Sequence, residues 1–212
     1  MNTRIRRTAT AVAFAAVLPF ALAACSDDTK DSASGNSGKA TPAASQSSEG
    51  MKDTDEPFGS ACASVPKDGA GSFDGMAKDP VATAASNNPA LSTLVTAVKK
   101  AGLVDTLNNA QNITVFAPTN DAFAKIPKAD LDKVLNDKEQ LTKILTYHVV
   151  GKRLAPADLS DGSFDTLEKS KLTTSGSGES YKVNDSANVV CGNVQTANAT
   201  VYIIDTVLMP KS

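Results

Sequence analysis

The hydrophobic positions between residues 88 and 102 repeat with the period of an amphipathic helix. Four of them lie at i, i+3, i+4 and i+7, on one helix face: Leu91, Leu94, Val95 and Val98. Asn88 followed by Pro89 is typical of a helix start, because the side chain caps the helix and proline suits its first turn. Gly102 follows the last apolar position, where a C-terminal glycine is expected. This pattern predicts one short helix.

Similar signals recur on both sides of this segment. Asp79 before Pro80 predicts another capped helix start. Apolar residues at helical spacing follow within 131–135 and again within 141–145, and Asp137 stands between the two groups as a predicted cap. The central part of the chain is therefore expected to contain several short helices.

Strand signals interrupt and then replace the helical pattern. Residues 113–117 are mostly β-branched or aromatic, and Pro118 ends the run. Further β-prone runs occur at 164–167, 171–174, 181–183, 189–194 and 200–204, separated by Gly, Ser and Asn. Residues 176–180 are rich in Gly and Ser and predict a hairpin loop. Helices that come first and strands that come later favour an α+β fold over a parallel α/β sheet.

The N-terminus has the pattern of an export signal. Arg4, Arg6 and Arg7 precede residues 9–24, which carry no charge. This apolar run is shorter than the roughly 20 residues that span a membrane, and it predicts a secretion signal over residues 1–25. The run ends in Leu-Ala-Ala-Cys at Cys25, which resembles the bacterial lipobox, and this resemblance implies that Cys25 is diacylated and becomes the mature N-terminus. The alternative is an ordinary signal peptide with Cys25 free or removed.

Residues 26–57 have the composition of a disordered tether. They contain seven Ser, three Gly and seven acidic residues, and Met51 is their single large apolar residue. Such a segment buries too little surface to offset its ordering entropy. As a random coil it reaches roughly 30 Å, enough to lift a domain at 58–212 off a membrane. The alternative is a leader that serves only solubility.

Composition excludes some classes of function. The chain has 212 residues, which suits one domain with additional unpacked sequence, and its 21 basic and 23 acidic residues leave no basic excess for nucleic-acid binding. One His excludes a metal centre built from several imidazoles. No nucleophile elbow, phosphate loop, dinucleotide glycine pattern or zinc motif occurs, so no cofactor and no metal are expected.

Three segments together resemble the fasciclin-like domain. They are residues 114–123 (TVFAPTNDAF), 147–150 (YHVV) and 198–210 (NATVYIIDTVLMP). The order and spacing of the segments fit, and the resemblance extends over about residues 74–210. Within the family, residues 79–89, 103–107 and 189–194 are most similar to secreted or lipid-anchored immunogenic proteins of mycobacteria and other actinobacteria. The resemblance implies a β-wedge or sandwich packed with several short helices, and a surface binding or adhesion role without enzymatic chemistry.

Cys62 and Cys191 remain as a pair once Cys25 is lipidated. Exported proteins occupy an oxidising compartment, and the similar actinobacterial proteins have cysteines at the matching positions, where they join an N-terminal arm to the sheet. A disulfide is therefore expected. A redox or metal pair is the alternative, without a Cys-x-x-Cys spacing to support it.

Four residues are candidates for binding: Tyr147, His148, Asn120 and Asp121. His148 continues the apolar face of residues 141–145, which predicts a hydrogen-bonded core histidine. The opposing interpretation is functional, because the Tyr-His segment is implicated in receptor binding in some animal relatives. Thr119 or Asn120 is the expected cap of a helix that follows Pro118. Asp205 interrupts an apolar run and is expected to bond the backbone at a turn.

These observations predict a non-catalytic, monomeric envelope protein. Lipid on Cys25 anchors it to the outer face of the cytoplasmic membrane, with release of some copies left open. Its fasciclin-like domain binds an extracellular protein or a polysaccharide. One alternative is a surface carrier or chaperone for a small apolar ligand, for which an apolar cleft would be evidence. A more distant alternative is a hydrolase that uses His148.

Overall fold

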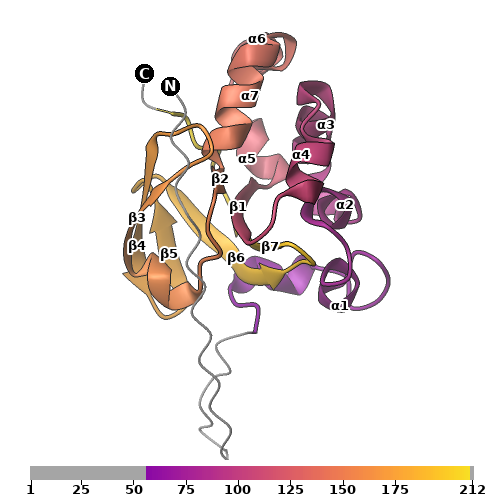
Figure 1. The fold of residues 1–212 in the computed structure, drawn as a ribbon, viewed down its shortest axis with the longest axis vertical. Helices are drawn as coiled ribbons and strands as arrows, with labels where there is room; N and C mark the ends of the chain where they lie inside the picture. Colours follow the sequence, from indigo (N-terminus) through magenta and orange to yellow (C-terminus); the bar gives the residue numbers. More distant parts are fainter. Residues whose placement is uncertain (1–55, 211–212) are drawn as a thin grey trace, which may run out of the picture. The chain divides into compact units, whose positions relative to one another are not determined.

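The computed structural model describes residues 56–210, which form a seven-stranded sheet with helices packed against it (Figure 1). The predicted signal segment, Cys25 and all but the last two residues of the predicted tether lie outside the described residues. Within 56–210, no helix has both the length and the apolar character needed to cross a membrane. The fold is α+β, as predicted.

The strand order is β2-β1-β7-β6-β5-β4-β3. The bounds are β1 Ile113–Pro118, β2 Val149–Val150, β3 Asp161–Asp165, β4 Lys171–Ser177, β5 Ser180–Val183, β6 Ala187–Gln195 and β7 Ala199–Ile204. Strands β1 and β7 pair in parallel, and all the other pairs of the described sheet are antiparallel. The strand pairing therefore places β1 and β7, the first and last strands of the described residues, side by side.

The sheet curls until its two ends nearly meet. Val150 of β2 forms a bridge with Thr166, which directly follows β3. The N–H of Leu167 donates to the carbonyl of Val149 at 2.8 Å. These contacts join the two edges of the sheet at one point, just beyond the end of β3. The result is a near-barrel with one face turned inward.

Side chains of β1 and β7 separate two hydrophobic cores, because successive residues of a strand point to opposite faces. One core lies on the helix side and includes Val115, Ala117, Val201 and Ile203. The other fills the inside of the curled sheet and includes Phe116, Tyr202, Ile204 and Leu172. All six residues of β1 and of β7 are buried, so these strands form the wall between the cores.

The α-helices cover the outer side of this wall (Figure 1), whereas Leu159 of the short helix Pro156–Leu159 lies in the core inside the curled sheet. The bounds are η1 Ser60–Ser64, α1 Phe73–Met76, α2 Val81–Ser86, η2 Pro89–Leu91, α3 Ser92–Ala101, α4 Val104–Asn109, α5 Asn120–Ala124, α6 Lys128–Asn136, α7 Lys138–Tyr147 and η3 Pro156–Leu159.

Three predicted helix ends are confirmed. Asn88 caps η2, Gly102 ends α3 with φ 73°, and Asp137 caps α7 through the N–H groups of Glu139 and Gln140.

The predicted cap at Asp79 is wrong. Pro80 is the N-cap position of α2 and provides no side-chain cap. The N–H of Val81 instead donates at 2.8 Å to Oδ1 of Asn198, which is 117 residues away in the chain. A tertiary contact thus takes the role that the local sequence favoured for Asp79.

The predicted strands of the C-terminal third are confirmed with shifted ends. Strand β3 begins at Asp161, three residues before the predicted run, because it pairs along its length with β4 from Asp161↔Ser175 to Asp165↔Lys171. Gly178 and Glu179 separate β4 from β5, in agreement with the predicted hairpin loop.

Candidate functional site

His148 is buried at the C-terminal end of α7, with 2% of its surface exposed. Nδ1 lies 2.8 Å from the carbonyl of Ile144, and Nε2 accepts a hydrogen bond from the N–H of Leu208 at 2.9 Å. A proton on Nδ1 and none on Nε2 satisfies both contacts, so the ring is neutral. Burial lowers the pKa of His148 from 6.5 to about 4, against an opposing contribution from the hydrogen bond to Ile144.

Tyr147 is buried on the other side of the wall, in the core inside the curled sheet. Its hydroxyl donates to the carbonyl of Lys171 at 3.1 Å and accepts from Nδ2 of Asn184 at 2.7 Å. Tyr147 and His148 therefore serve two different cores. Both side chains have their hydrogen-bonding groups occupied by partners within the fold.

Asn120 and Asp121 begin α5 directly after β1. Thr119 is the cap of α5 and accepts from the N–H of Ala122 at 3.2 Å. Asn120 instead joins α5 to α3 and η2: it accepts from the N–H of Thr93 at 2.9 Å and donates to the carbonyl of Pro89 at 2.9 Å. Of the four candidate binding residues, Asp121 is the exposed one.

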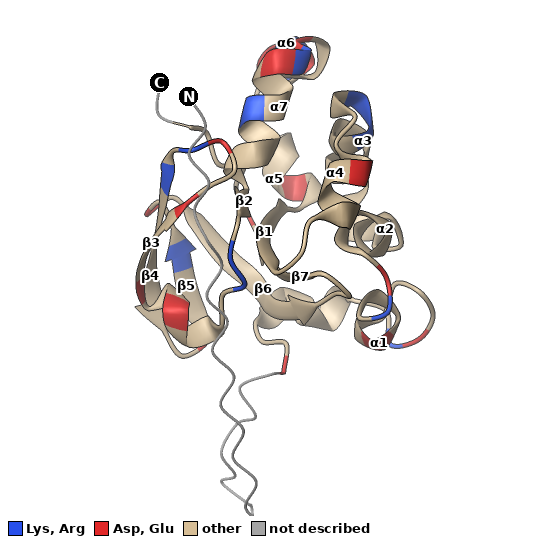
Figure 2. Ribbon diagram, in the orientation of Figure 1, with Lys and Arg blue, Asp and Glu red and all other residues tan. Residues whose placement is uncertain are grey.

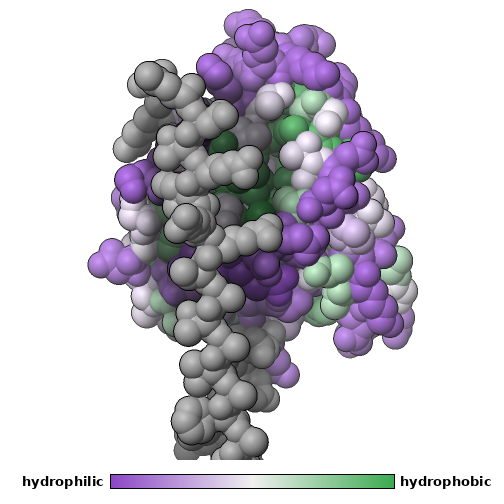
Figure 3. Space-filling model, viewed as in Figure 1, coloured by the Kyte–Doolittle hydropathy of each residue, from purple (hydrophilic) through white to green (hydrophobic). Residues whose placement is uncertain are grey.

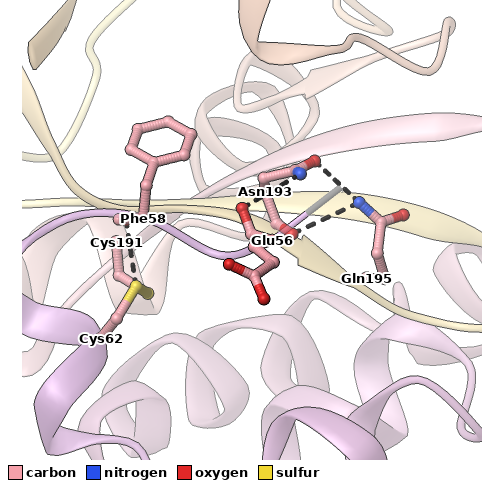
Figure 4. Close-up of a disulfide and its surroundings, with 6 residues drawn as sticks. All are labelled: Glu56, Phe58, Cys62, Cys191, Asn193 and Gln195. Atoms are coloured by element: carbon pink, nitrogen blue, oxygen red, sulfur yellow. Dashed lines mark hydrogen bonds between the residues drawn. A yellow bond between two sulfur atoms is a disulfide. The ribbon is translucent and has the colours of Figure 1, made fainter. Parts of the chain in front are cut away.

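Cys62 and Cys191 form a disulfide with a Cα–Cα distance of 4.9 Å (Figure 4). The bond joins η1 to the central strand β6. Beside it, the backbones of Phe58 and Gly192 exchange two hydrogen bonds of 3.1 and 2.7 Å. The ring of Phe58 packs 5.5 Å from that of Tyr181. The N-terminal arm is thus attached to the sheet by a covalent bond, a backbone bridge and an aromatic contact.

Asp205 bonds the backbone at the end of β7, as predicted. Its carboxylate accepts from the backbone N–H and from the side-chain amide of Asn188, both at 2.9 Å. Partial burial raises the pKa of this carboxyl, but the hydrogen bonds from Asn188 and Thr206 and the charge of Lys125 outweigh burial and lower it. These contacts give Asp205 a structural role.

The charged side chains of the described elements are intermixed in sign (Figure 2). Ion pairs within residues 56–210 join side chains of opposite charge, among them Lys125–Asp205, Lys133–Asp130 and Lys171–Asp165. Within residues 56–210, no group of three or more His, Cys, Asp or Glu side chains is placed to hold a metal ion.

An apolar cavity of about 50 Å³ lies between the helices and the sheet. Residues of α2, α3, α4, β1 and β7 line it. Hydrophobic residues gather on the face between α7 and the α3–α4 pair (Figure 3). No local sequence pattern indicates this cavity, because its walls come from segments more than 100 residues apart in the chain.

Asn198, which is 4% exposed, has a structural role that was not predicted from the sequence. Its Nδ2 donates to the carbonyls of Leu107 at 2.8 Å and Ala110 at 2.7 Å, while Oδ1 accepts from Val81. One amide thereby joins the start of α2, the end of α4 and the β6–β7 turn. The available signal was a polar residue directly before the apolar run of β7.

Comparison with known proteins agrees with this architecture. Residues 89–210 match the Fasciclin domain family. The chain is 46% identical to the cell surface glycolipoprotein MPB83 of Mycobacterium bovis, over 97% of both chains. It is 51% identical to the immunogenic protein MPT70 of Mycobacterium tuberculosis, over 68% of this chain and 76% of that protein.

A solved structure of a FAS1 domain pair from the insect cell adhesion molecule Fasciclin I has a similar fold. The TM-score is 0.53 at 22% identity, and the match covers 64% of this chain and 52% of the insect chain, about half of its length. The insect structure therefore supports the fold alone. The family match over residues 89–210 and the similarity to MPB83 along nearly the whole chain establish that this protein belongs to the fasciclin domain family.

Proposed function

We propose that this protein is a lipid-anchored component of the cell surface whose fasciclin domain binds another macromolecule without catalysis. The observation that carries the proposal is the 46% identity to a cell surface glycolipoprotein over 97% of both chains. This similarity includes the N-terminal region, where the lipobox-like segment ends at Cys25. The partner is an extracellular protein or a polysaccharide.

The lipid anchor has a direct test. Cells that express the full chain are fed an alkyne-bearing fatty acid, and the purified protein is examined for the label. The wild type is expected to carry label and to partition into detergent, whereas Cys25→Ser is expected to lose both properties. Cys62→Ser serves as the control, because Cys62 belongs to the disulfide. Label of equal intensity in Cys25→Ser would refute the anchor at this residue.

A non-catalytic role is supported by the surroundings of Tyr147 and His148. A general base needs a free nitrogen within reach of a proton to be removed. Both ring nitrogens of His148 bond the backbone, and its pKa of about 4 makes it a weak base. The hydrolase alternative therefore has no support from this part of the structure.

A surface for the macromolecule is suggested by two exposed apolar side chains. Leu167 and Met209 are 40% and 47% exposed and are the exposed large hydrophobic residues of the described chain. Met209 lines a shallow hollow together with Glu168, Lys143 and Gln140. An apolar centre with a polar and charged rim is typical of a protein interface. We use the name α7 hollow for the surface formed by Leu167 together with the residues of this hollow, which include Met209.

Binding is tested on cells that display the full chain. Adhesion to immobilised cell-wall polysaccharide and to extracellular matrix protein is compared with cells that lack the protein. The double variant Leu167→Asp/Met209→Asp is expected to lower the specific adhesion at least tenfold. Ala157→Asp, an exposed residue outside the α7 hollow, is the matched control and is expected to bind as the wild type does. Adhesion no stronger than that of cells without the protein would refute the proposal.

A further inference from the structure

The apolar cavity reaches from the buried sheet to the surface. Its inner wall includes Val115 and Val201, which are 7% and 6% exposed. Its outer wall includes Ser86, which is exposed, and Val95 and Val104, which are partly exposed. A cavity of about 50 Å³ is several times the roughly 10–15 Å³ that one water needs. It therefore has room for several ligand atoms, and a longer molecule could extend through the opening.

Asn88 adds one unpartnered donor to this apolar wall. The residue lines the cavity and is 2% exposed. Its Oδ1 accepts from the N–H of Ala90 at 3.0 Å, which fixes the orientation of the amide. Nδ2 then has no hydrogen-bond partner among the described residues. A buried donor without a partner costs free energy, so a group that accepts from Nδ2 would be stabilised there.

The other polar side chains of the wall are already engaged. Ser86 donates to the carbonyl of Ala82, and Thr196 both donates to and accepts from the backbone of Ala199. His148 uses both ring nitrogens. Among the residues that line the cavity, all of which are described, Nδ2 of Asn88 is therefore the side-chain donor that a ligand could use.

The lining also defines the charge of the ligand. It contains no Lys, Arg, Asp or Glu. A carboxylate or an ammonium group would lie there without a counter-charge, at a large desolvation cost. A neutral oxygen acceptor, such as the carbonyl of a ketone or an ester, pairs with one N–H donor and needs no charge. The hydrocarbon part of such a molecule gains from burial against the apolar walls.

We propose that this cavity is a binding site for a neutral, hydrocarbon-rich molecule, and that Nδ2 of Asn88 donates a hydrogen bond to its carbonyl oxygen. This role is additional to the macromolecular binding proposed above. It uses the cavity between the helices and the sheet, whereas the proposed adhesion surface is the α7 hollow. The carbonyl is that of a free alkyl ketone or of an acyl ester.

The test uses a photoreactive 2-alkanone on cells that display the full chain. The probe carries a diazirine in its alkyl chain and a terminal alkyne, and labelled peptides are mapped by mass spectrometry after illumination. Label is expected within the α2 and α3 peptides. Excess 2-octanone or methyl octanoate is expected to prevent it, and their relative potency distinguishes a ketone from an ester ligand. Octanoate is expected to compete at least tenfold less effectively, because its charge has no partner in the cavity.

Two variants and one control separate binding from folding. Asn88→Ala removes the donor together with the acceptor for Ala90, and it should label about tenfold less, equal to about 1.4 kcal/mol. Ala85→Phe fills the cavity beside an unchanged Asn88 and should abolish specific labelling. Ala129→Phe, an exposed residue of α6 outside the cavity, should label as the wild type does.

Thermal unfolding is measured for each variant. If Asn88→Ala fails to fold, the comparison of labelling between Ala85→Phe and Ala129→Phe tests the proposal. Equal labelling of these two folded variants, or label spread over peptides outside the cavity, would overturn the proposal. Adhesion of Ala85→Phe equal to that of the wild type would show that the two proposed sites are separate, so failure of one would not imply failure of the other.

Discussion

The Nε2 atom of His148 accepts a hydrogen bond from the backbone N–H of Leu208 at 2.9 Å, across 60 residues of sequence. The same ring bonds the carbonyl of Ile144 through Nδ1. A buried, neutral imidazole thus joins the end of α7 to the segment that follows β7. The single histidine of the chain holds the C-terminal segment in place, and this role depends on its protonation state.

The stability of the domain should therefore fall in mild acid. The pKa of His148 is about 4 in the folded state and near 6.5 in the unfolded state. As the pH falls, the histidine of the unfolded chain binds a proton before that of the folded chain. The contribution of neutral His148 to the free energy of unfolding is therefore complete above pH 6.5 and is lost progressively towards pH 4. The expected loss in the free energy of unfolding is about 3 kcal/mol, because each unit of difference between the two pKa values corresponds to about 1.4 kcal/mol. Urea unfolding at pH 7.5, 5.5 and 4.5 measures it.

His148→Gln is the control for this effect. Glutamine has no proton equilibrium in this range, so the variant should be less stable at pH 7.5 and should lose the part of the pH dependence between 6.5 and 4. An unchanged pH dependence in His148→Gln would assign the acid sensitivity between pH 6.5 and 4 to groups other than His148.

Removal of the Asn198 side chain should destabilise the packing of the helices on the sheet. Asn198→Ala leaves the N–H of Val81 and the carbonyls of Leu107 and Ala110 without their partner. At about 1–3 kcal/mol for each buried group, the expected loss is about 3 kcal/mol or more in the free energy of unfolding. Chemical denaturation of the two proteins measures the difference.

Asn198→Asp is the informative companion variant. The aspartate can still accept from Val81 but cannot donate to Leu107 and Ala110, and it places a negative charge beside their carbonyls. It should be no more stable than Asn198→Ala at neutral pH and should improve at low pH, as the carboxyl gains a proton. Wild-type stability in either variant would contradict the role given to Asn198.

Loss of the disulfide should destabilise the fold through the unfolded chain. The bond joins residues separated by 129 positions, and the chain-entropy model assigns a loop of this length about 4–5 kcal/mol. The double variant Cys62→Ser/Cys191→Ser should unfold at lower urea concentration, with protection from hydrogen exchange lost first around Phe58 and Gly192, where the arm bridges β6. A variant as stable as the wild type would show that the arm is held by its noncovalent contacts alone.

Tyr147→Phe should cost about 1–2 kcal/mol, because it leaves the carbonyl of Lys171 and Nδ2 of Asn184 without the hydroxyl that both contact. Tyr181→Phe is the matched control, because Tyr181 lies in the same core as Tyr147. Equal changes in the unfolding free energies of both variants would contradict the role given to the Tyr147 hydroxyl. A loss of adhesion without loss of stability in Tyr147→Phe would point to a binding role.

Local sequence signals predicted the helix ends correctly where the residues that end a helix lie within it or directly beside it. Gly102 ends α3 because its left-handed backbone is favourable for glycine, and Asp137 caps α7 through N–H groups two and three residues away. The apolar face of residues 141–145 likewise predicted that His148 is buried. These outcomes depend on neighbours within one or two helical turns, which the sequence shows directly.

The contacts between segments far apart in the sequence were decided by the tertiary structure, because they depend on which of these segments meet. The parallel pairing of β1 with β7 brings the amide of Asn198 to the start of α2, where it replaces the cap predicted at Asp79. Folding also sends Tyr147 and His148 into different cores and leaves the donor of Asn88 unpartnered in an apolar wall. Hydrophobic periodicity identifies the faces that must be buried, but the polar contacts between distant segments are defined only when those faces pack.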